Sequence, residues 1–103
     1  MAVSLAQHPY AQAASGSNSQ TLTLTQAITV GNLIVVCVAA GKASGPTLTV
    51  ASVTDNAGTP NTYVQATGTG MPGANAQNNP KLSTDIWYCL SATAAPTTIT
   101  VNY

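Results

Sequence analysis

Threonine alternates with apolar residues in several separate segments of this chain, and this alternation is the strongest constraint on its fold. The clearest segments are residues 21–25, 47–50 and 98–103. A period of two places every second side chain on the same side of an extended strand, so that one face is apolar and the other is wet. Because threonine is β-branched, it favours the extended backbone while its hydroxyl faces water. Each segment is therefore predicted to be a β-strand with one buried face.

Two further segments, residues 33–38 and 86–90, are apolar without interruption. A short run of this kind between turn-forming residues is typical of a strand that is covered on both faces. Both are therefore predicted to be central strands. Residues 2–6 and 62–65 show a weaker strand pattern. No segment combines helical periodicity with an N-cap and sufficient length, so no substantial helix is expected.

Turn-forming residues separate the predicted strands, mainly at residues 31–32, 41–46, 55–61 and 94–96. About seven short strands with turns at this spacing predict an all-β fold, namely a β-sandwich or jelly roll of antiparallel strands. We assign residues 1–18 to an N-terminal arm and residues 19–103 to the β-sandwich domain. Residues 68–80 form a long loop within that domain. The last strand must pair within the domain, or it leaves an open edge for another subunit.

Charge is nearly absent from the chain. Of 103 residues, the fully charged ones are Lys42, Lys81, Asp55 and Asp85, and the net charge is zero. Two lysines cannot form the cationic cluster that nucleic acids or anionic membranes require. The longest apolar run, residues 33–40, is also far shorter than the roughly 20 residues that cross a bilayer. A neutral surface lacks the repulsion that keeps proteins apart, so we expect association with itself or with a protein partner.

The two cysteines, Cys37 and Cys89, both lie in predicted central strands. This position fits two buried free thiols that pack as small hydrophobic side chains. A disulfide between neighbouring strands or facing sheets is the alternative, and it requires an oxidising environment. No metal site is expected, because His8 is the single histidine and no Cys-x-x-Cys spacing is present.

The chain offers few side chains for catalysis. A Ser-His-Asp triad would depend on His8 near the N-terminus, and a glycosidase would need both Asp55 and Asp85. Asp55 lies in a Thr-Asp-Asn-Ala-Gly segment, whose residue types favour a turn over a calcium site. We therefore predict no enzymatic activity and no cofactor.

Aromatic residues are the remaining candidates for a binding surface. Carbohydrate-binding sandwiches present aromatic rings to sugars, and Tyr63 and Trp87 are the candidates for such a platform. In a chain without phenylalanine, Trp87 is favoured for the core. Tyr63 is left open between the core and a ligand or partner contact. His8 and Tyr10, in the N-terminal arm, are further candidate partner contacts.

Four segments, taken in order, form a recognisable set. Residues 27–36 place Gly-Asn-Leu before a hydrophobic strand, and residues 53–63 place Thr-Asp-x-x-Gly before Asn-Thr-Tyr with two inserted residues. Residues 86–88 and 97–101 follow as an aromatic strand and a Thr-rich closing strand. This set, within residues 20–103, resembles a β-sandwich family found in phage virion proteins and bacterial surface proteins. The resemblance transfers no catalytic residue. The chain departs from that family in its cysteines and in stopping where members often continue with further strands.

The leading hypothesis is a bacteriophage virion structural protein, either a capsid decoration (cement) protein or a head fibre component. Such a protein would assemble as a homo-oligomer and bind the major capsid protein or another virion protein, with residues 1–18 as the docking arm. Residues 1–20 lack the pattern of a signal peptide, which fits synthesis in a host cytoplasm and localisation to the virion. The alternative is a carbohydrate-binding or adhesive module of a bacterial surface protein, extracellular or at the cell surface, with a glycan near Tyr63 and residues 68–80.

Overall fold

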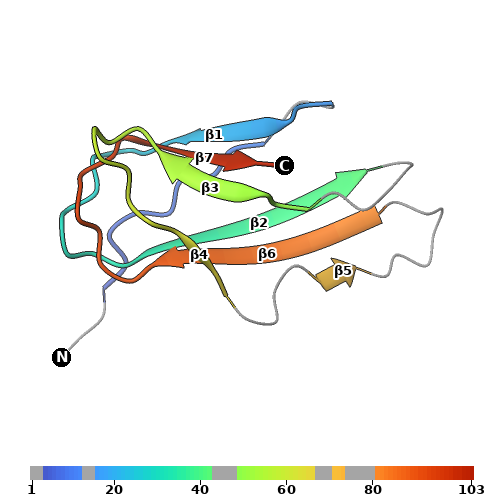
Figure 1. Cartoon of the computed structure of the whole chain (residues 1–103). Coiled ribbons are helices and arrows are strands. Elements are labelled where there is room, and N and C mark those ends of the chain that lie inside the picture. Colours follow the sequence, from blue (N-terminus) through green and yellow to red (C-terminus); the bar gives the residue numbers. More distant parts are fainter. Residues whose placement is uncertain (1–3, 13–15, 43–48, 67–70, 74–80) are drawn as a thin grey trace.

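The computed structural model describes residues 4–12, 16–42, 49–66, 71–73 and 81–103. Within these residues the chain forms β-strands and no helix, which confirms the predicted all-β class (Figure 1). The strands are β1 (Ser19–Thr23), β2 (Ile34–Lys42), β3 (Ser52–Asp55), β4 (Val64–Gln65), β5 (Met71–Gly73), β6 (Lys81–Cys89) and β7 (Thr98–Asn102). They form two antiparallel sheets, the first in the order β1-β7-β3 and the second in the order β2-β6-β4, with β5 also paired to β6.

The first sheet is built on β7, which pairs with β1 on one side and β3 on the other. Ile99 and Val101 of β7 are buried, and the residues that alternate with them, Thr98, Thr100 and Asn102, are partly exposed. On the outer side, the hydroxyl oxygens of Thr21 and Thr100 lie 3.0 Å apart across the β1–β7 pair. The strands predicted from threonine alternation near residues 21–25 and 98–103 are therefore confirmed, and the last of them lies in the middle of its sheet.

The second sheet contains the longest pairing, in which β2 and β6 run from Ile34 opposite Cys89 to Lys42 opposite Lys81. Along β2, Ile34 and Val36 are buried whereas Val35 is exposed. The prediction that both apolar runs are covered on both faces is wrong, because only one face of this sheet packs against the core. The predicted central position is correct for β6 but not for β2, which lies at the edge.

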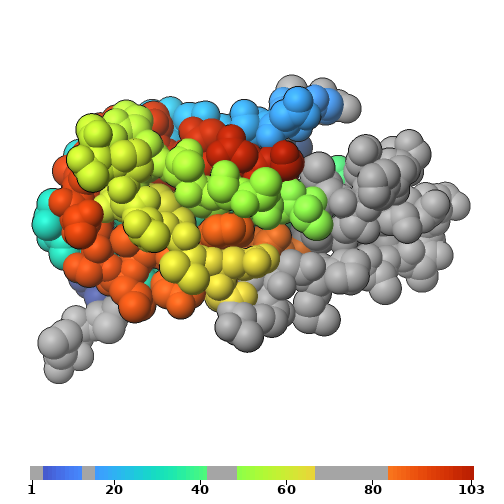
Figure 2. Space-filling model, in the orientation of Figure 1, coloured from blue at the N-terminus to red at the C-terminus, as the bar shows by residue number. Residues whose placement is uncertain are grey.

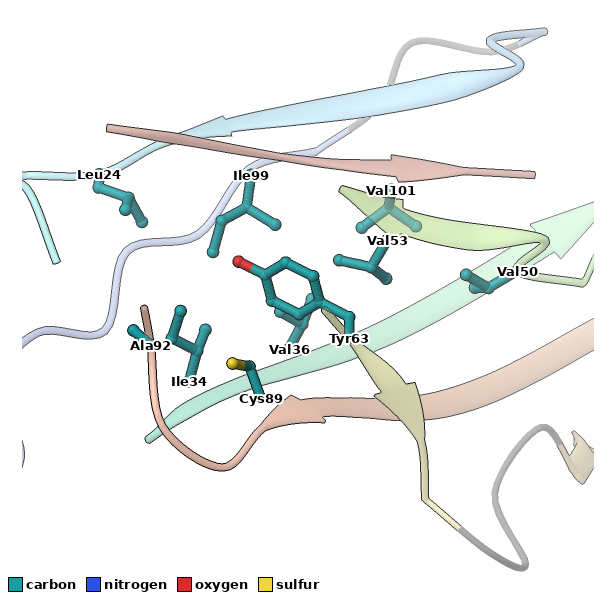
Figure 3. Packing of buried hydrophobic residues seen from close by; sticks show 10 residues of the cluster. All are labelled: Leu24, Ile34, Val36, Val50, Val53, Tyr63, Cys89, Ala92, Ile99 and Val101. Carbon is teal, nitrogen blue, oxygen red and sulfur yellow. The ribbon is translucent and has the colours of Figure 1, made fainter. Parts of the chain in front are cut away.

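Side chains from both sheets meet in one apolar core (Figure 3). Its buried members are Leu24, Ile34, Val36, Val50, Val53, Tyr63, Cys89, Ala92, Ile99 and Val101. Full burial of one side chain of the Val, Leu or Ile class stabilises a fold by about 1.5–3 kcal/mol. The inward-facing side chains of both sheets and of the connecting segments therefore attach the two sheets to each other.

A tight turn leads the chain into β2. The Asn32 N–H donates to the Thr29 carbonyl at 3.1 Å, and Gly31 between them has a φ of 93°. A positive φ at the third position is typical of a type II turn and explains the glycine there. The Gly31 N–H also donates to the Ala92 carbonyl at 2.8 Å, which attaches this turn to the segment before β7.

Three predicted segments differ from the structure. Residues 4–6 of the weak strand at 2–6 are not in a strand, and residues 1–3 lie outside the described residues. Of the predicted strand at 47–50, residues 47 and 48 lie outside them too, and pairing with β7 begins only at Ala51, which donates to the Asn102 carbonyl at 2.7 Å. The predicted loop at 68–80 contains β5, and its other residues are not described.

Candidate functional site

The carboxylate of Asp55, at the end of β3, closes the loop that follows that strand. Its Oδ1 accepts a hydrogen bond from the Ala57 N–H at 3.1 Å. Its Oδ2 accepts from the Asn61 N–H at 3.3 Å, from Asn61 Nδ2 at 2.7 Å and from the Tyr63 hydroxyl at 2.9 Å. One side chain therefore holds both ends of the segment from Asp55 to Tyr63, and the predicted turn at Asp55 is confirmed.

Asn61 is buried and joins this loop to the segment before β7. Its Oδ1 accepts hydrogen bonds from the Thr93 N–H at 2.7 Å and the Ala94 N–H at 3.1 Å. Its Nδ2 donates to the Ala94 carbonyl at 3.4 Å as well as to Asp55. Asn61 thus satisfies backbone groups that lie more than 30 positions away in the sequence.

Asn56 makes a second connection of the same kind. Its Oδ1 accepts from the N–H groups of Thr97 at 2.9 Å and Thr98 at 3.0 Å, and its Nδ2 donates to the Thr97 hydroxyl at 2.9 Å. Together, Asp55, Asn56 and Asn61 form a polar network that attaches the loop after β3 to the start of β7. We call these three residues the polar lock.

The polar lock shifts the titration of two of the groups that it joins. Burial alone would raise the pKa of Asp55, but hydrogen bonds from Asn61, from the Ala57 N–H and from Tyr63 outweigh it and hold the pKa below its usual value. Burial, followed by the hydrogen bond to Asp55 and the charge of that residue, raises the pKa of the Tyr63 phenol. Asp55 is therefore ionised at neutral pH and Tyr63 is not. The Tyr63 hydroxyl and the Asp55 carboxylate are hydrogen-bonded to each other, which indicates a structural role for both.

The second carboxylate, Asp85, lies within β6 and is 2% exposed. It accepts a hydrogen bond from Gln65 Nε2 of β4. Trp87, two residues further along β6, packs against the core, as expected. Its Nε1 is buried and has no hydrogen-bond partner among the described residues. Asp55 and Asp85 belong to different sheets, so the topology does not pair them on one strand or on neighbouring strands.

The two cysteines lie on opposite faces of the second sheet. Cys89 is buried in the core, whereas Cys37 is exposed. The register places Cys37 opposite Ile86 and Cys89 opposite Ile34, so the two residues are not cross-strand neighbours. Both thiols are free. The structure therefore does not contain the alternative, a Cys37–Cys89 disulfide. Of the two thiols predicted to be buried, only Cys89 is buried.

Tyr63 occupies the middle of the core rather than the surface. Its ring lies between side chains of the two sheets (Figure 3), and the residue is only 8% exposed. In the space-filling view, the segment from β3 to β4 forms a continuous layer over this side of the molecule, in green to yellow (Figure 2). Of the two interpretations that the sequence leaves open for Tyr63, this placement favours the core over a ligand or partner contact.

The N-terminal arm is attached to the domain through Gln7. The Gln7 Oε1 accepts from the Thr25 N–H at 3.0 Å, and its Nε2 donates to the Gln26 carbonyl at 2.9 Å. His8 and Tyr10, which follow this attachment, are both exposed, Tyr10 by 93%. Their exposure leaves them free for contacts, and their role as partner contacts stays a prediction.

The second sheet exposes apolar side chains on the side that faces away from the core. Alternation along the strands directs Val35 and Cys37 of β2, Ile86 of β6 and Val64 of β4 to this side. Tyr88 of β6 is the register partner of both Val35 and Val64, so these two valines lie on either side of it. Val35 is 52%, Val64 49% and Ile86 40% exposed. We call this surface the outer face, and its described residues are Val35, Cys37, Ala39, Val64, Thr84, Ile86 and Tyr88. None of these side chains is charged.

Leucines continue this surface just beyond the ends of the strands. Leu33 precedes β2 and is 57% exposed, and Leu90 follows β6 and is 75% exposed. Contiguous apolar side chains at a protein surface are typical of an interaction site. Residues 33–38 are apolar without interruption, and this pattern alone does not distinguish a strand with an exposed apolar face from one that is covered on both faces.

Among the described residues, no group of three or more His, Cys, Asp or Glu side chains could hold a metal ion. The same part of the chain contains no helix of the length and hydropathy needed to cross a membrane. In comparisons with protein-family models, curated proteins and solved structures, nothing matches this chain.

Proposed function

We propose that this chain is a non-enzymatic virion structural protein, either a phage capsid decoration (cement) protein or a head fibre protein. In this role it binds the particle surface and assembles with itself. The observation that carries the proposal is the apolar outer face of the second sheet, on which Val35, Val64 and Ile86 are between 40% and 52% exposed. Binding through such a face requires no cofactor and no catalytic group.

Physical chemistry supports association through this face. Each Å² of apolar surface that is removed from water contributes about 25 cal/mol. Charged groups would add the cost of desolvation, and the described side chains of the outer face have none. Because the whole chain has zero net charge, two copies also approach without net repulsion. Many weak apolar contacts repeated around a symmetric particle give a strong attachment.

The internal architecture supports the fold-level part of the proposal. We infer that the two sheets close on each other as a β-sandwich or jelly roll, because both supply side chains to one core. The resemblance to the virion and surface protein family rests partly on its Thr-Asp-x-x-Gly and Asn-Thr-Tyr pattern. In this chain, Asp55 binds both Asn61 and Tyr63 of that pattern. The pattern therefore has a physical reason, since its residues close one loop.

The N-terminal arm is the proposed contact with the major capsid protein or another virion protein. Leu5 is 76% and Tyr10 is 93% exposed, so the arm presents one aliphatic and one aromatic side chain to the solvent. Anchoring at Gln7 keeps both close to the domain. The protein would be made in the host cytoplasm and end in the virion.

Light scattering of the purified chain across a dilution series is the first test. A stable closed oligomer is the expected result, and the next step is sedimentation of that oligomer with purified empty phage capsids. Co-sedimentation that is lost when residues 1–12 are removed would support docking through the arm. A chain that stays monomeric at high concentration and does not sediment with capsids contradicts the proposal.

A carbohydrate-binding or adhesive module, extracellular or at a cell surface, remains the alternative. It has less support because Tyr63, its proposed sugar-stacking residue, is buried and bonded to Asp55. Saturable binding to a glycan array by a monomeric chain would favour this alternative over the virion proposal.

A further inference from the structure

β2 has one paired side and one open side. Its register with β6 is continuous over nine residues, from Ile34 to Lys42. No other strand among the described residues pairs with β2. Within the described part of the chain, the longest pairing is therefore flanked by a strand edge to which no further strand pairs.

The hydrogen bonds of β6 identify which groups of β2 point to that open side. The Ala66 N–H donates to the Ile86 carbonyl at 2.8 Å, so the backbone of Ile86 is directed away from β2. Cys37 lies opposite Ile86 and is therefore in a pair without hydrogen bonds between β2 and β6. By the alternation of an antiparallel ladder, the N–H and C=O groups of Val35, Cys37 and Ala39 point to the open edge.

Over Ile34 to Gly41 this edge lacks the features by which proteins protect exposed strands, and the one charged residue of β2 is Lys42 at its end. Such edges usually contain a lysine, a proline or a β-bulge. From Ile34 to Gly41, β2 has no charged residue and no proline, and its register with β6 is unbroken. In the view of Figure 1 the N-terminal arm overlaps the Ile34 end of β2. Among the described residues no strand pairs with this edge, so its backbone groups can accept another strand.

We propose that β2 pairs antiparallel with β2 of a second copy of this chain, about a two-fold axis at Cys37. In this register Cys37 lies opposite Cys37 of the second copy, and Val35 lies opposite Ala39. These three residues are the ones whose backbone groups face the open edge, so each finds both a donor and an acceptor. The result is one sheet that continues through both copies, with their two outer faces joined side by side.

A second copy fits this edge better than an unrelated strand. An interface on a two-fold axis uses the same strand from both copies. β2 meets this requirement because the groups of Val35 and Ala39, which face the edge, lie two positions before and two positions after Cys37. Neither copy brings a charge to residues 34–41, so no charge must be desolvated. The inference rests on the self-assembly part of the proposed function and specifies the surface that mediates it.

A pair of lysine substitutions tests the pairing by light scattering. Cys37→Lys places two like charges directly opposite each other at the axis, and we expect the dissociation constant to rise by at least about tenfold. Thr23→Lys is the matched control, because Thr23 is exposed at the end of β1, an edge strand of the other sheet. It should leave the mass unchanged. Thermal melting of both variants establishes that each has folded.

Mild oxidation of the unaltered chain is a second, independent measurement. A hydrogen-bonded antiparallel pair places Cα atoms about 5.5 Å apart, which lies within the roughly 4.4–6.8 Å range of disulfides. We therefore expect a Cys37-linked dimer that Cys37→Ser abolishes, while buried Cys89 stays reduced.

The outcomes separate this inference from the proposed function. An oligomer of unchanged mass in Cys37→Lys, with no disulfide-linked dimer, overturns pairing through β2 but leaves self-assembly in place. A monomeric unaltered chain overturns both pairing through β2 and the self-assembly part of the proposed function. A monomer whose Cys37 becomes protected from a thiol reagent only after capsids are added assigns the edge to a capsid strand and overturns pairing between copies.

Discussion

The polar lock and the outer face distribute polar and apolar groups in opposite ways. The polar lock places Asn61 in the interior, 5% exposed, and satisfies it with hydrogen bonds. The outer face leaves Val35 and Ile86 in contact with water. A chain with four charged residues cannot rely on ion pairs, so it uses neutral amides for internal attachment. The contrast shows that polar side chains do not mark the proposed binding surface of this protein, because the polar lock is internal and the outer face is apolar.

Asn61→Ala is expected to have the largest effect on folding. It leaves the N–H groups of Thr93 and Ala94 without their side-chain acceptor, and it removes one of the hydrogen bonds to the Asp55 carboxylate. Each unsatisfied group of this kind costs about 1–3 kcal/mol, so the free energy of unfolding should fall by about 3 kcal/mol or more. Urea denaturation measures this. Asn32→Ala, at an exposed position, is the control and should change it by less than about 0.5 kcal/mol. Equal losses in the two variants would mean that the polar lock does not stabilise the fold.

A drop in pH should weaken the polar lock to a smaller extent. Because the pKa of Asp55 is lowered in the folded state, its contribution to stability is present above the ordinary value of 3.8 and is lost as the pH falls through the folded pKa. We expect a loss of about 1 kcal/mol from this residue between pH 6 and pH 3, the size of a few hydrogen bonds to a partly solvated carboxylate. Urea titrations at the two pH values measure it. Asp55→Asn should be less stable at pH 6 and show a flatter pH dependence, and an unchanged slope in that variant contradicts the assignment.

Substitution of the outer face should affect folding least. Ile86→Thr removes an apolar side chain that is 40% exposed while keeping a β-branched residue, so the free energy of unfolding should change by less than about 1 kcal/mol. Association should weaken, which a shift of the light-scattering dilution curve detects. Val53→Thr, inside the core, is the opposite case and should destabilise the fold more than Ile86→Thr does. If Ile86→Thr destabilises folding as much, the outer face belongs to the structural core and the comparison fails.

The sequence predicts the elements of this fold better than their environment. Threonine alternation locates β1 and β7, because the pattern is local and has the period of a strand. The apolar run at residues 33–38 predicts a strand correctly but not its exposure, since a strand with an apolar contact surface has the same composition as one in the core. The exposure of Cys37 follows from its place on the outer side of the sheet, which no local pattern encodes.

Only part of the polar lock can be predicted from the sequence. The turn at Asp55 is predictable because Asp, Asn and Gly favour turns within a few residues. The contacts of Asn61 with residues 93 and 94 depend on how distant segments meet in space, and no spacing rule connects them. Tyr63 shows the same limit, because its place in the core depends on side chains from both sheets and on the hydrogen bond that its hydroxyl donates to Asp55 rather than on its neighbours in the sequence.

The central place of β7 in the first sheet has a consequence for the speed of folding. Among the residues that the structure describes, β1 and β3 do not pair with each other, and each pairs with β7 alone. Contacts such as that between Thr21 and Thr100 join positions 79 apart. Closing loops of this length costs chain entropy before the contacts compensate for it, and domains with many such pairings fold in milliseconds to seconds. The first sheet therefore forms only when its C-terminal strand is in place between β1 and β3.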